Sequence, residues 1–238
     1  MQSYHLLWEL VQICLEHPGL VGVEAAAGGD STGFLYPFLD AAEFDEDALR
    51  RSLVSSAAEK RAESGSVAAD ALQRNRHEIE AAAASIANAA RQGGRVFTIG
   101  NGGSSTDAAR LVRLLRAIGV EAWSLAADYA VLSALANDLG AEHVFARQLG
   151  AFTRPGDVLI ACSTSGASPN LLRAFEYADT HALIGVGIAG YGGGGFAHQD
   201  GVDHRLVVES SSVHRIQEAQ AAIITSLCER VERFGGSS

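Results

Sequence analysis

A glycine-rich turn between an expected strand and an expected helix constrains the fold more than any other feature of the chain. The apolar run at 96–99 reads Val-Phe-Thr-Ile, and residues 100–105 after it read Gly-Asn-Gly-Gly-Ser-Ser. A helical pattern then covers 106–117. Glycines let backbone N–H groups approach an anion, and the helix directs its positive N-terminal end toward that anion. The spacing matches neither a P-loop nor a dinucleotide-binding fingerprint, so it predicts an anion site of another kind.

A second turn of the same type follows further along the chain. The apolar run at 157–162 is typical of a buried parallel strand. Residues 163–168 read Ser-Thr-Ser-Gly-Ala-Ser, and a helical pattern follows at 171–180. A single cluster of this kind is equally well explained as an ordinary helix cap. Two clusters, both at strand-to-helix junctions, favour a shared phosphate-binding site.

Strands and helices alternate from residue 96 onward, which is the signature of a parallel α/β sheet. We expect strands at 96–99, 121–124, 158–162, 182–188 and 204–208. We expect helices at 106–117, 130–138, 144–152, 171–180 and 215–233, preceded by one or two long helices within 48–90. The glycine turn at 190–195 is interpreted mainly as a connection.

Composition limits the classes of function. A chain of 238 residues with 47% hydrophobic residues suits one α/β domain with an extension. A net charge of −10 argues against broad nucleic-acid binding. Cys14, Cys162 and Cys228 are scattered, which argues against a disulfide framework. Because we find neither a long apolar run nor a targeting leader, we expect a cytoplasmic protein without membrane or nucleic-acid partners.

Several motifs occur in an order that resembles a known family. They are GNGGS at 100–104, LAND at 135–138, FARQ at 145–148, RPGD at 154–157, STSG at 163–166 and RIQE at 215–218. Together they resemble the sugar isomerase (SIS) family, and within it the phosphoheptose (sedoheptulose 7-phosphate) isomerase branch, over residues 48–234. The resemblance implies a doubly wound, Rossmann-like sheet of about five parallel strands flanked by helices, and a role in carbohydrate metabolism.

The resemblance also implies a domain organisation. Residues 1–47 would form an N-terminal extension and linker, and 48–238 the SIS domain. Helices within 48–90 would pack across subunits and build a homo-oligomer, a tetramer or a dimer. Residues 4–15 have the pattern of an amphipathic helix. That helix is interpreted either as a docking element or as a frayed terminus.

The resemblance assigns a nearly complete set of contacts to a phosphorylated sugar. Serines and backbone amides would hold the phosphate, whereas Asn137, Asp138 and Gln217 would face the sugar. The expected substrate-binding residues are Asn101, Gly102, Gly103, Ser104, Asn137, Asp138, Ser163, Thr164, Ser165, Ser168 and Gln217.

The chain departs from the family pattern at the zinc site. After GNGGS the family has Asp-Ala-x-His with Glu four residues later, and it has His eight residues after the Gln of RIQE. Here these positions hold Arg110, Leu114 and Thr225, so only Gln217 remains of the four ligand positions. Arginine stays protonated and only donates hydrogen bonds. We therefore expect no metal and no cofactor.

Two interpretations of Arg110 remain open. It could replace the lost cation and bind the substrate, or it could be a structural arginine paired with Glu218 or Asp107. If the chain does transfer protons, Glu218 and His214 are the catalytic candidates, since both flank Gln217 at the start of the closing helix. The ordinary alternatives are a surface histidine and a glutamate that stabilises the helix N-terminus.

Three functions are compatible with the sequence. The expected one is a phosphosugar-binding SIS protein that lacks most of the zinc and acid–base site. The first alternative is an active ketose or aldose phosphate isomerase with a rebuilt, metal-free centre. The second is an oligomeric adaptor or regulatory protein.

Overall fold

The computed structural model describes residues 7, 11 and 46–236. The chain divides into two compact units, Met1–Gly65 and Ser66–Ser238. Helix α2 (Glu46–Arg74) begins in the first unit. Apart from residues 7 and 11, the amphipathic pattern expected at 4–15 lies outside the described residues, as does most of the expected linker.

Five parallel strands form one sheet in the second unit, in the order β2-β1-β3-β4-β5. Their bounds are Val96–Gly100 (β1), Ala122–Ser124 (β2), Val158–Cys162 (β3), Ile184–Gly190 (β4) and His204–Val208 (β5). The chain first builds β2 on one side of β1 and then crosses to β3 on the other side. In open α/β sheets, ligands bind at the carboxyl ends of strands where the order reverses in this way. The expected α/β fold is confirmed, and its switch point lies between β1 and β3.

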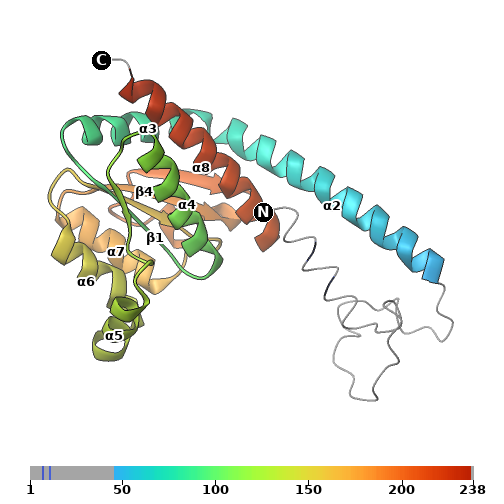
Figure 1. Cartoon of the computed structure of the whole chain (residues 1–238), viewed down its shortest axis with the longest axis horizontal. Helices are drawn as coiled ribbons and strands as arrows, with labels where there is room; N and C mark the ends of the chain where they lie inside the picture. Colours follow the sequence, from blue (N-terminus) through green and yellow to red (C-terminus); the bar gives the residue numbers. More distant parts are fainter. Residues whose placement is uncertain (1–6, 8–10, 12–45, 237–238) are drawn as a thin grey trace. The chain divides into compact units, whose positions relative to one another are not determined.

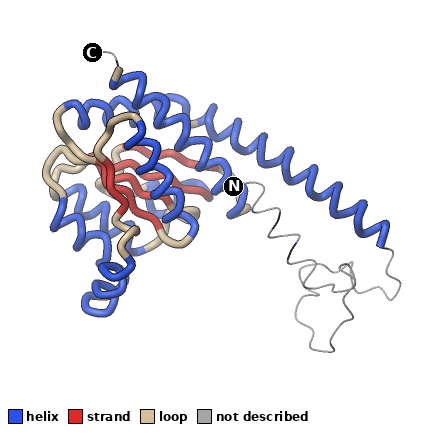
Figure 2. Tube along the Cα trace, viewed as in Figure 1, coloured by secondary structure: helices blue, strands red, loops and turns tan. Residues whose placement is uncertain are grey.

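Helices cover both faces of this sheet (Figure 1, Figure 2). One face carries α3 (Arg76–Arg91), α4 (Gly103–Ala117) and α8 (Val213–Gly235). The other carries α5 (Tyr129–Leu139), α6 (Val144–Phe152) and α7 (Pro169–Thr180), with the short 3-10 helices η3 (Ala141–His143) and η4 (Tyr191–Ala197). Among the described residues, no helix has the length and apolar character needed to cross a membrane.

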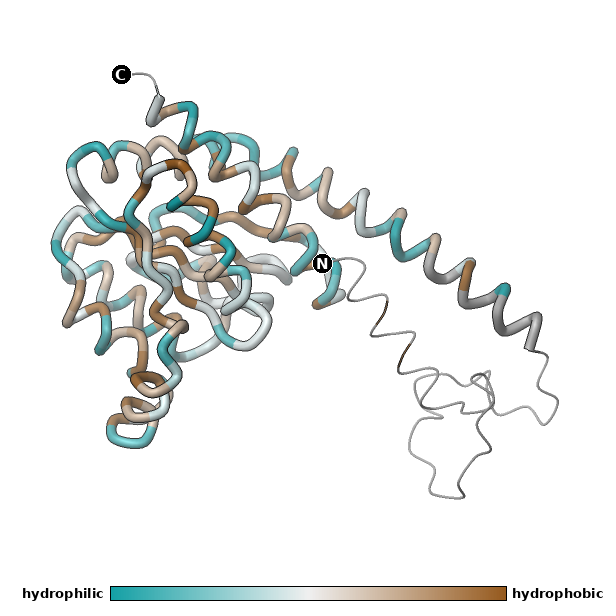
Figure 3. The backbone as a smooth tube through the Cα atoms, in the orientation of Figure 1, coloured by the Kyte–Doolittle hydropathy of each residue, from teal (hydrophilic) through white to brown (hydrophobic). Residues whose placement is uncertain are grey.

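The three central strands, β1, β3 and β4, are mostly apolar because both of their faces are buried. In β3, Val158, Ile160 and Cys162 join the cluster under α3, α4 and α8, whereas Leu159 and Ala161 join the cluster under α6 and α7. Hydrophobic residues accordingly concentrate along the strands and the inner sides of the helices (Figure 3). This alternation explains a continuous apolar run in a strand that has no polar face.

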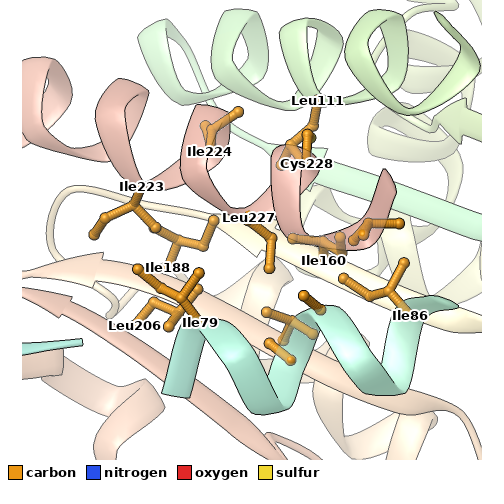
Figure 4. Packing of buried hydrophobic residues seen from close by; sticks show 14 of the residues in the cluster. Ile79, Ile86, Leu111, Ile160, Ile188, Leu206, Ile223, Ile224, Leu227 and Cys228 are labelled. Atoms are coloured by element: carbon orange, nitrogen blue, oxygen red, sulfur yellow. The ribbon is translucent and has the colours of Figure 1, made fainter. Parts of the chain in front are cut away.

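Helix α8 seals the first face through one apolar stripe. Ile223 and Leu227 on this helix are fully buried, as are Ile79 and Ile86 on α3, and Figure 4 shows the four side chains in one cluster with residues of the strands. Fully burying an aliphatic side chain contributes about 2 kcal/mol. The stripe therefore fixes α8 on the sheet, and with it the polar residues at its N-terminal end.

The buried carboxylate of Asp157 ties together the amino ends of β1 and β3. It accepts hydrogen bonds from the Arg95 backbone N–H (2.8 Å), the Arg95 guanidinium (2.9 Å) and the Arg154 backbone N–H (3.0 Å). We expect Asp157→Ala to lower the free energy of unfolding by about 3 kcal/mol, because three partly buried N–H donors lose their charged acceptor. The exposed pair Asp70–Arg74 provides the control, and Asp70→Ala should cost less than about 1 kcal/mol. Equal losses in urea unfolding would contradict this role.

Candidate functional site

Two loops lie next to each other at the carboxyl ends of β1 and β3. Gly100, the last residue of β1, is in register with Cys162, the last residue of β3. The loop after β1 leads directly into α4 at Gly103, and the loop after β3 leads into α7 at Pro169. The structure thus brings together the two turns that the sequence analysis selected, although more than fifty residues separate them in the chain.

The helices that begin at these loops have no side-chain caps. Gly102 precedes α4 and Ser168 precedes α7, and neither makes a side-chain capping hydrogen bond. By contrast, Asp128 accepts two backbone N–H groups of α5, and Ser212 accepts one of α8. The first-turn N–H groups of a helix need partners. Loop carbonyl oxygens satisfy some of them, because Ser104 donates to Asn101 in α4 and Leu171 donates to Ser168 in α7. The positive ends of the two helices, which have no side-chain cap, are still well suited to an anion placed between the two loops.

Glycines in the first loop make room for close packing. A Cβ on Gly100 would lie 2.5 Å from the carbonyl oxygen of Ser104, and a Cβ on Gly103 would overlap the amide of Gln217. Gly102 adopts a left-handed conformation with φ of 51°, which favours glycine. The expected binding residue Gln217 is therefore placed against the first loop, and Ser104 is buried beneath it.

Serine side chains stabilise the second loop. Ser163 Oγ accepts the backbone N–H of Gly166 at 2.9 Å, and Ser165 Oγ accepts that of Ala167 at 3.3 Å. Ser163 is buried, whereas Ser165 is exposed and Thr164 half-buried. Ser163 thus holds the loop from below, and Ser165 lies at its surface.

A fully buried glutamine, Gln220 of α8, supports this loop from the helix side. Its amide donates to the carbonyl oxygens of Ser163 (2.7 Å) and Ile188 (3.4 Å), at the ends of β3 and β4. Gln220 was not among the residues expected to form the site. It lies on α8 one turn beyond Gln217, so the same helix contributes one amide at the first loop and another beneath the second.

The glycine turn after β4 packs against the second loop. The backbone N–H groups of Gly190 and Phe196 donate to the carbonyl oxygens of Thr164 (3.0 Å) and Gly166 (3.2 Å). A Cβ on Gly194 would overlap the Ser165 carbonyl oxygen. The turn is therefore more than the connection that the sequence analysis assumed, because its glycines allow two backbones to touch.

The side chains of Asn101 and Asn170 connect the two loops. Each carboxamide donates to the carbonyl oxygen of the other, and both distances are 2.9 Å. Asn101 was expected to bind substrate, whereas the sequence analysis did not assign a role to Asn170, the second residue of α7. The pair forms a bridge across the site.

Arg110 contacts Thr225, another position that the resemblance assigns to a zinc ligand. Its guanidinium donates to the Thr225 hydroxyl at 2.8 Å, and that hydroxyl donates to the Ala221 carbonyl oxygen at 2.9 Å. The structural interpretation of Arg110 named Glu218 or Asp107 as its partner. The hydrogen bond instead goes to Thr225, and Glu218 forms a buried ion pair with Arg215, with 3.2 Å between Oε2 and Nε.

A buried carboxyl group lies one helical turn before Arg110. Asp107 is fully buried, and neither of its carboxyl oxygens has a hydrogen-bond partner. Burial raises its pKa from 3.8 to about 6, against a smaller lowering by Arg110. Burial, and secondarily the Asp107 charge, also raises the pKa of the Cys162 thiol well above its usual value.

The remaining expected site residues are His214 on α8 and Asn137 and Asp138 on α5. His214 is half-buried in the first turn of α8. Asn137 and Asp138 are exposed at the end of α5, where the Asn137 amide donates to the Asp138 carboxylate at 2.9 Å. Because α5 packs mainly on η3 and α6, these two side chains are held by a different part of the fold from the two loops.

Comparison with known proteins places this site in a family. The family model described as the SIS domain matches residues 61–190, more than half of the chain. The chain belongs to the SIS domain family. It is 38% identical over 172 residues to a phosphoheptose isomerase of Thiobacillus denitrificans, covering 69% of this chain and 86% of that protein.

Solved structures agree with this assignment. A phosphoheptose isomerase from Neisseria gonorrhoeae is 30% identical with a TM-score of 0.73, covering 76% of this chain and 99% of that one. Another from Francisella tularensis is 26% identical with a TM-score of 0.68, covering 80% of this chain and 100% of that one. The SIS domain of this chain therefore carries its two loops on the scaffold of the phosphoheptose isomerases.

Proposed function

We propose that this SIS protein binds a phosphorylated sugar and lacks the zinc-dependent isomerase chemistry of its relatives. The phosphate would lie between the loops at 101–105 and 163–168. The observation that carries the proposal is the meeting of two uncapped helix N-termini, α4 and α7, at the switch point of the sheet. Helix N-termini without side-chain caps, and the positive ends of their dipoles, favour an anion at that place.

The surroundings of the loops support a phosphosugar over a bare anion. The Gln217 amide lies against the first loop, and the exposed Ser165 and Asn101 provide further polar groups. Hydroxyls and amides are suitable partners for sugar hydroxyls. The similar proteins are named phosphoheptose isomerases, so a seven-carbon sugar phosphate is the first ligand to test.

The side chains near Arg110 do not fit a zinc ion. Arginine offers no lone pair, Leu114 has no donor atom, and the Thr225 hydroxyl already accepts from Arg110. Among residues 46–236, no group of three His, Cys, Asp or Glu side chains gathers in a way that would hold a metal. We therefore derive no step through zinc, and Arg110 would supply a fixed positive charge to the bound sugar.

Glu218, one of the two catalytic candidates, is not well placed for proton transfer. Glu218 is buried against Arg215, and a general base must lie within hydrogen-bond reach of the proton that it removes. The similarity to named isomerases nevertheless favours one alternative, a metal-free isomerase that uses Glu218 or His214. Turnover distinguishes that alternative from binding alone.

We further propose that the protein is a homo-oligomer. Trp123, Tyr129 and Phe152 are 50%, 82% and 53% exposed, and they line one cavity beside α5 and α6. Helix α5 is apolar in sequence but contains no fully buried residue. Exposed apolar surface of this kind is typical of an interface.

Calorimetric titration with sedoheptulose 7-phosphate tests the proposed binding. The wild-type protein should bind equally well with and without a metal chelator. Arg110→Met should weaken binding about tenfold, because a charge-assisted contact is lost. Arg113→Met, at an exposed position of the same helix, is the matched control and should leave the affinity unchanged. Loss of binding on chelation would contradict the metal-free site, and equal affinities of the two variants would contradict the role of Arg110.

A further inference from the structure

The bridge between Asn101 and Asn170 joins two segments that are 69 positions apart in the sequence. Asn101 lies between β1 and α4, and Asn170 lies in the first turn of α7. Two reciprocal hydrogen bonds of 2.9 Å fix both side chains relative to each other. The bridge therefore connects the starts of the two helices whose N–H groups would bind phosphate.

The bridge lies on the open side of the site. Beneath the loops, β1 and β3 are already held by their ladder, which ends at Gly100 and Cys162. Asn101 is exposed and Asn170 is half-buried, so the bridge lies at the surface of the protein. Two loops that are connected only at their base, where the strands end, can still move apart at the surface. A second connection at the surface sets the distance between them.

The reciprocal pairing leaves part of each carboxamide available. Each amide has two N–H donors and an oxygen with two lone pairs. The pairing uses one N–H and one lone pair of each side chain. The bridge thus leaves one N–H group of Asn101 over, and a donor held in this position suits an anionic ligand.

We propose that Asn170 is a positioning residue, which acts through Asn101 to set the spacing of the two phosphate-binding loops. This inference rests on the proposed function. Because the bridge sets the geometry of the phosphate site, its loss weakens binding of inorganic phosphate and of a sugar phosphate by the same factor. A residue that contacted only the sugar would leave the affinity for inorganic phosphate unchanged.

The test is a double-mutant cycle with Asn101→Ala, Asn170→Ala and the double variant. Affinities for sedoheptulose 7-phosphate and for inorganic phosphate are measured for the full chain. Asn170→Ala should weaken both about tenfold, and the double variant should be no weaker than Asn101→Ala alone, because both changes break the same bridge. The unliganded melting temperature should stay within about 2 °C, since the pair lies at the surface. Asn88→Ala, at an exposed position of α3, is the control.

The outcomes separate this inference from the proposed function. If the wild-type protein binds neither ligand, the phosphosugar site itself is wrong, and the bridge has no role. If the wild-type protein binds both and Asn170→Ala binds them equally well, the bridge does not position the loops. A loss confined to the sugar phosphate, or losses that multiply in the double variant, would also overturn the inference.

Discussion

Replacing Gly166 by alanine is expected to lower the free energy of unfolding by about 3 kcal/mol and to remove phosphosugar binding. Gly166 has a φ of 63°, a left-handed conformation that alanine adopts only at a cost. A Cβ at this position would also overlap the Gly193 carbonyl oxygen. That atom belongs to backbone, so the second loop and the glycine turn must move apart, and Ser165 moves with them.

Gly119→Ala is the matched control for this change. Gly119 also has a left-handed conformation, with φ of 83°, but nothing lies within 4 Å of the Cβ that alanine would add. Gly119→Ala should lower the free energy of unfolding by about 1 kcal/mol and leave ligand affinity intact. Thermal unfolding and titration below the melting temperature measure both effects. Full affinity in Gly166→Ala would show that the contact between the turn and the loop does not shape the site.

Asp107→Asn is expected to stabilise the protein in a pH-dependent way. The Asp107 carboxyl has a pKa raised from 3.8 to about 6 by burial, so the folded state holds its proton more tightly than the unfolded state does. Ionisation therefore disfavours folding. The resulting loss in the free energy of unfolding is absent below pH 4, grows between pH 4 and 6, and reaches about 3 kcal/mol above pH 6. Asparagine has no charge to bury and avoids this cost.

Urea unfolding of both proteins between pH 4 and pH 8 measures the difference. The free energy of unfolding of Asp107→Asn should rise relative to that of the wild-type protein as the pH rises through this window. The difference should level off above pH 6. The exposed Asp200 provides the control, and Asp200→Asn should follow the wild-type curve. A pH-independent difference between Asp107→Asn and the wild-type protein would mean that Asp107 does not ionise in the buried position.

Local pattern was sufficient to predict most of the fold. The bounds expected for the strand at 158–162, the strand at 204–208 and the helix at 144–152 agree with the structure. Continuous apolar runs mark strands buried on both faces, and such runs are visible in the sequence. The strand expected at 182–188 lies instead at Ile184–Gly190, because Ala182 has a positive φ of 53° and belongs to the preceding turn.

The residues that hold the two loops in place could not be predicted in the same way. Gln220 resembles any polar residue of an amphipathic helix until the helix is placed against the ends of β3 and β4. Asn170 follows a proline at the start of a helix, which is an ordinary capping pattern. Its partner Asn101 comes from a distant segment. Contacts between segments far apart in sequence have no local signal, so these residues required the structure.

The positions that the resemblance assigns to zinc ligands could be identified in the sequence, but the contact between two of them could not. Arg110 and Thr225 are 115 positions apart, and the structure joins them by a hydrogen bond. A guanidinium and a hydroxyl thus meet where the resemblance implied two metal ligands. This contact supports the proposal that the protein lacks the zinc-dependent chemistry of its relatives.

Incubation of the purified protein with sedoheptulose 7-phosphate, followed by NMR detection of isomerised product, shows whether the protein binds this sugar phosphate without converting it. The same sample reports binding through the shift of the melting temperature. We expect a clear shift without product, whether zinc is added or removed. Product formation by the wild-type protein that Glu218→Gln abolishes, while that variant stays folded and still binds the ligand, would contradict the account and establish a metal-free isomerase.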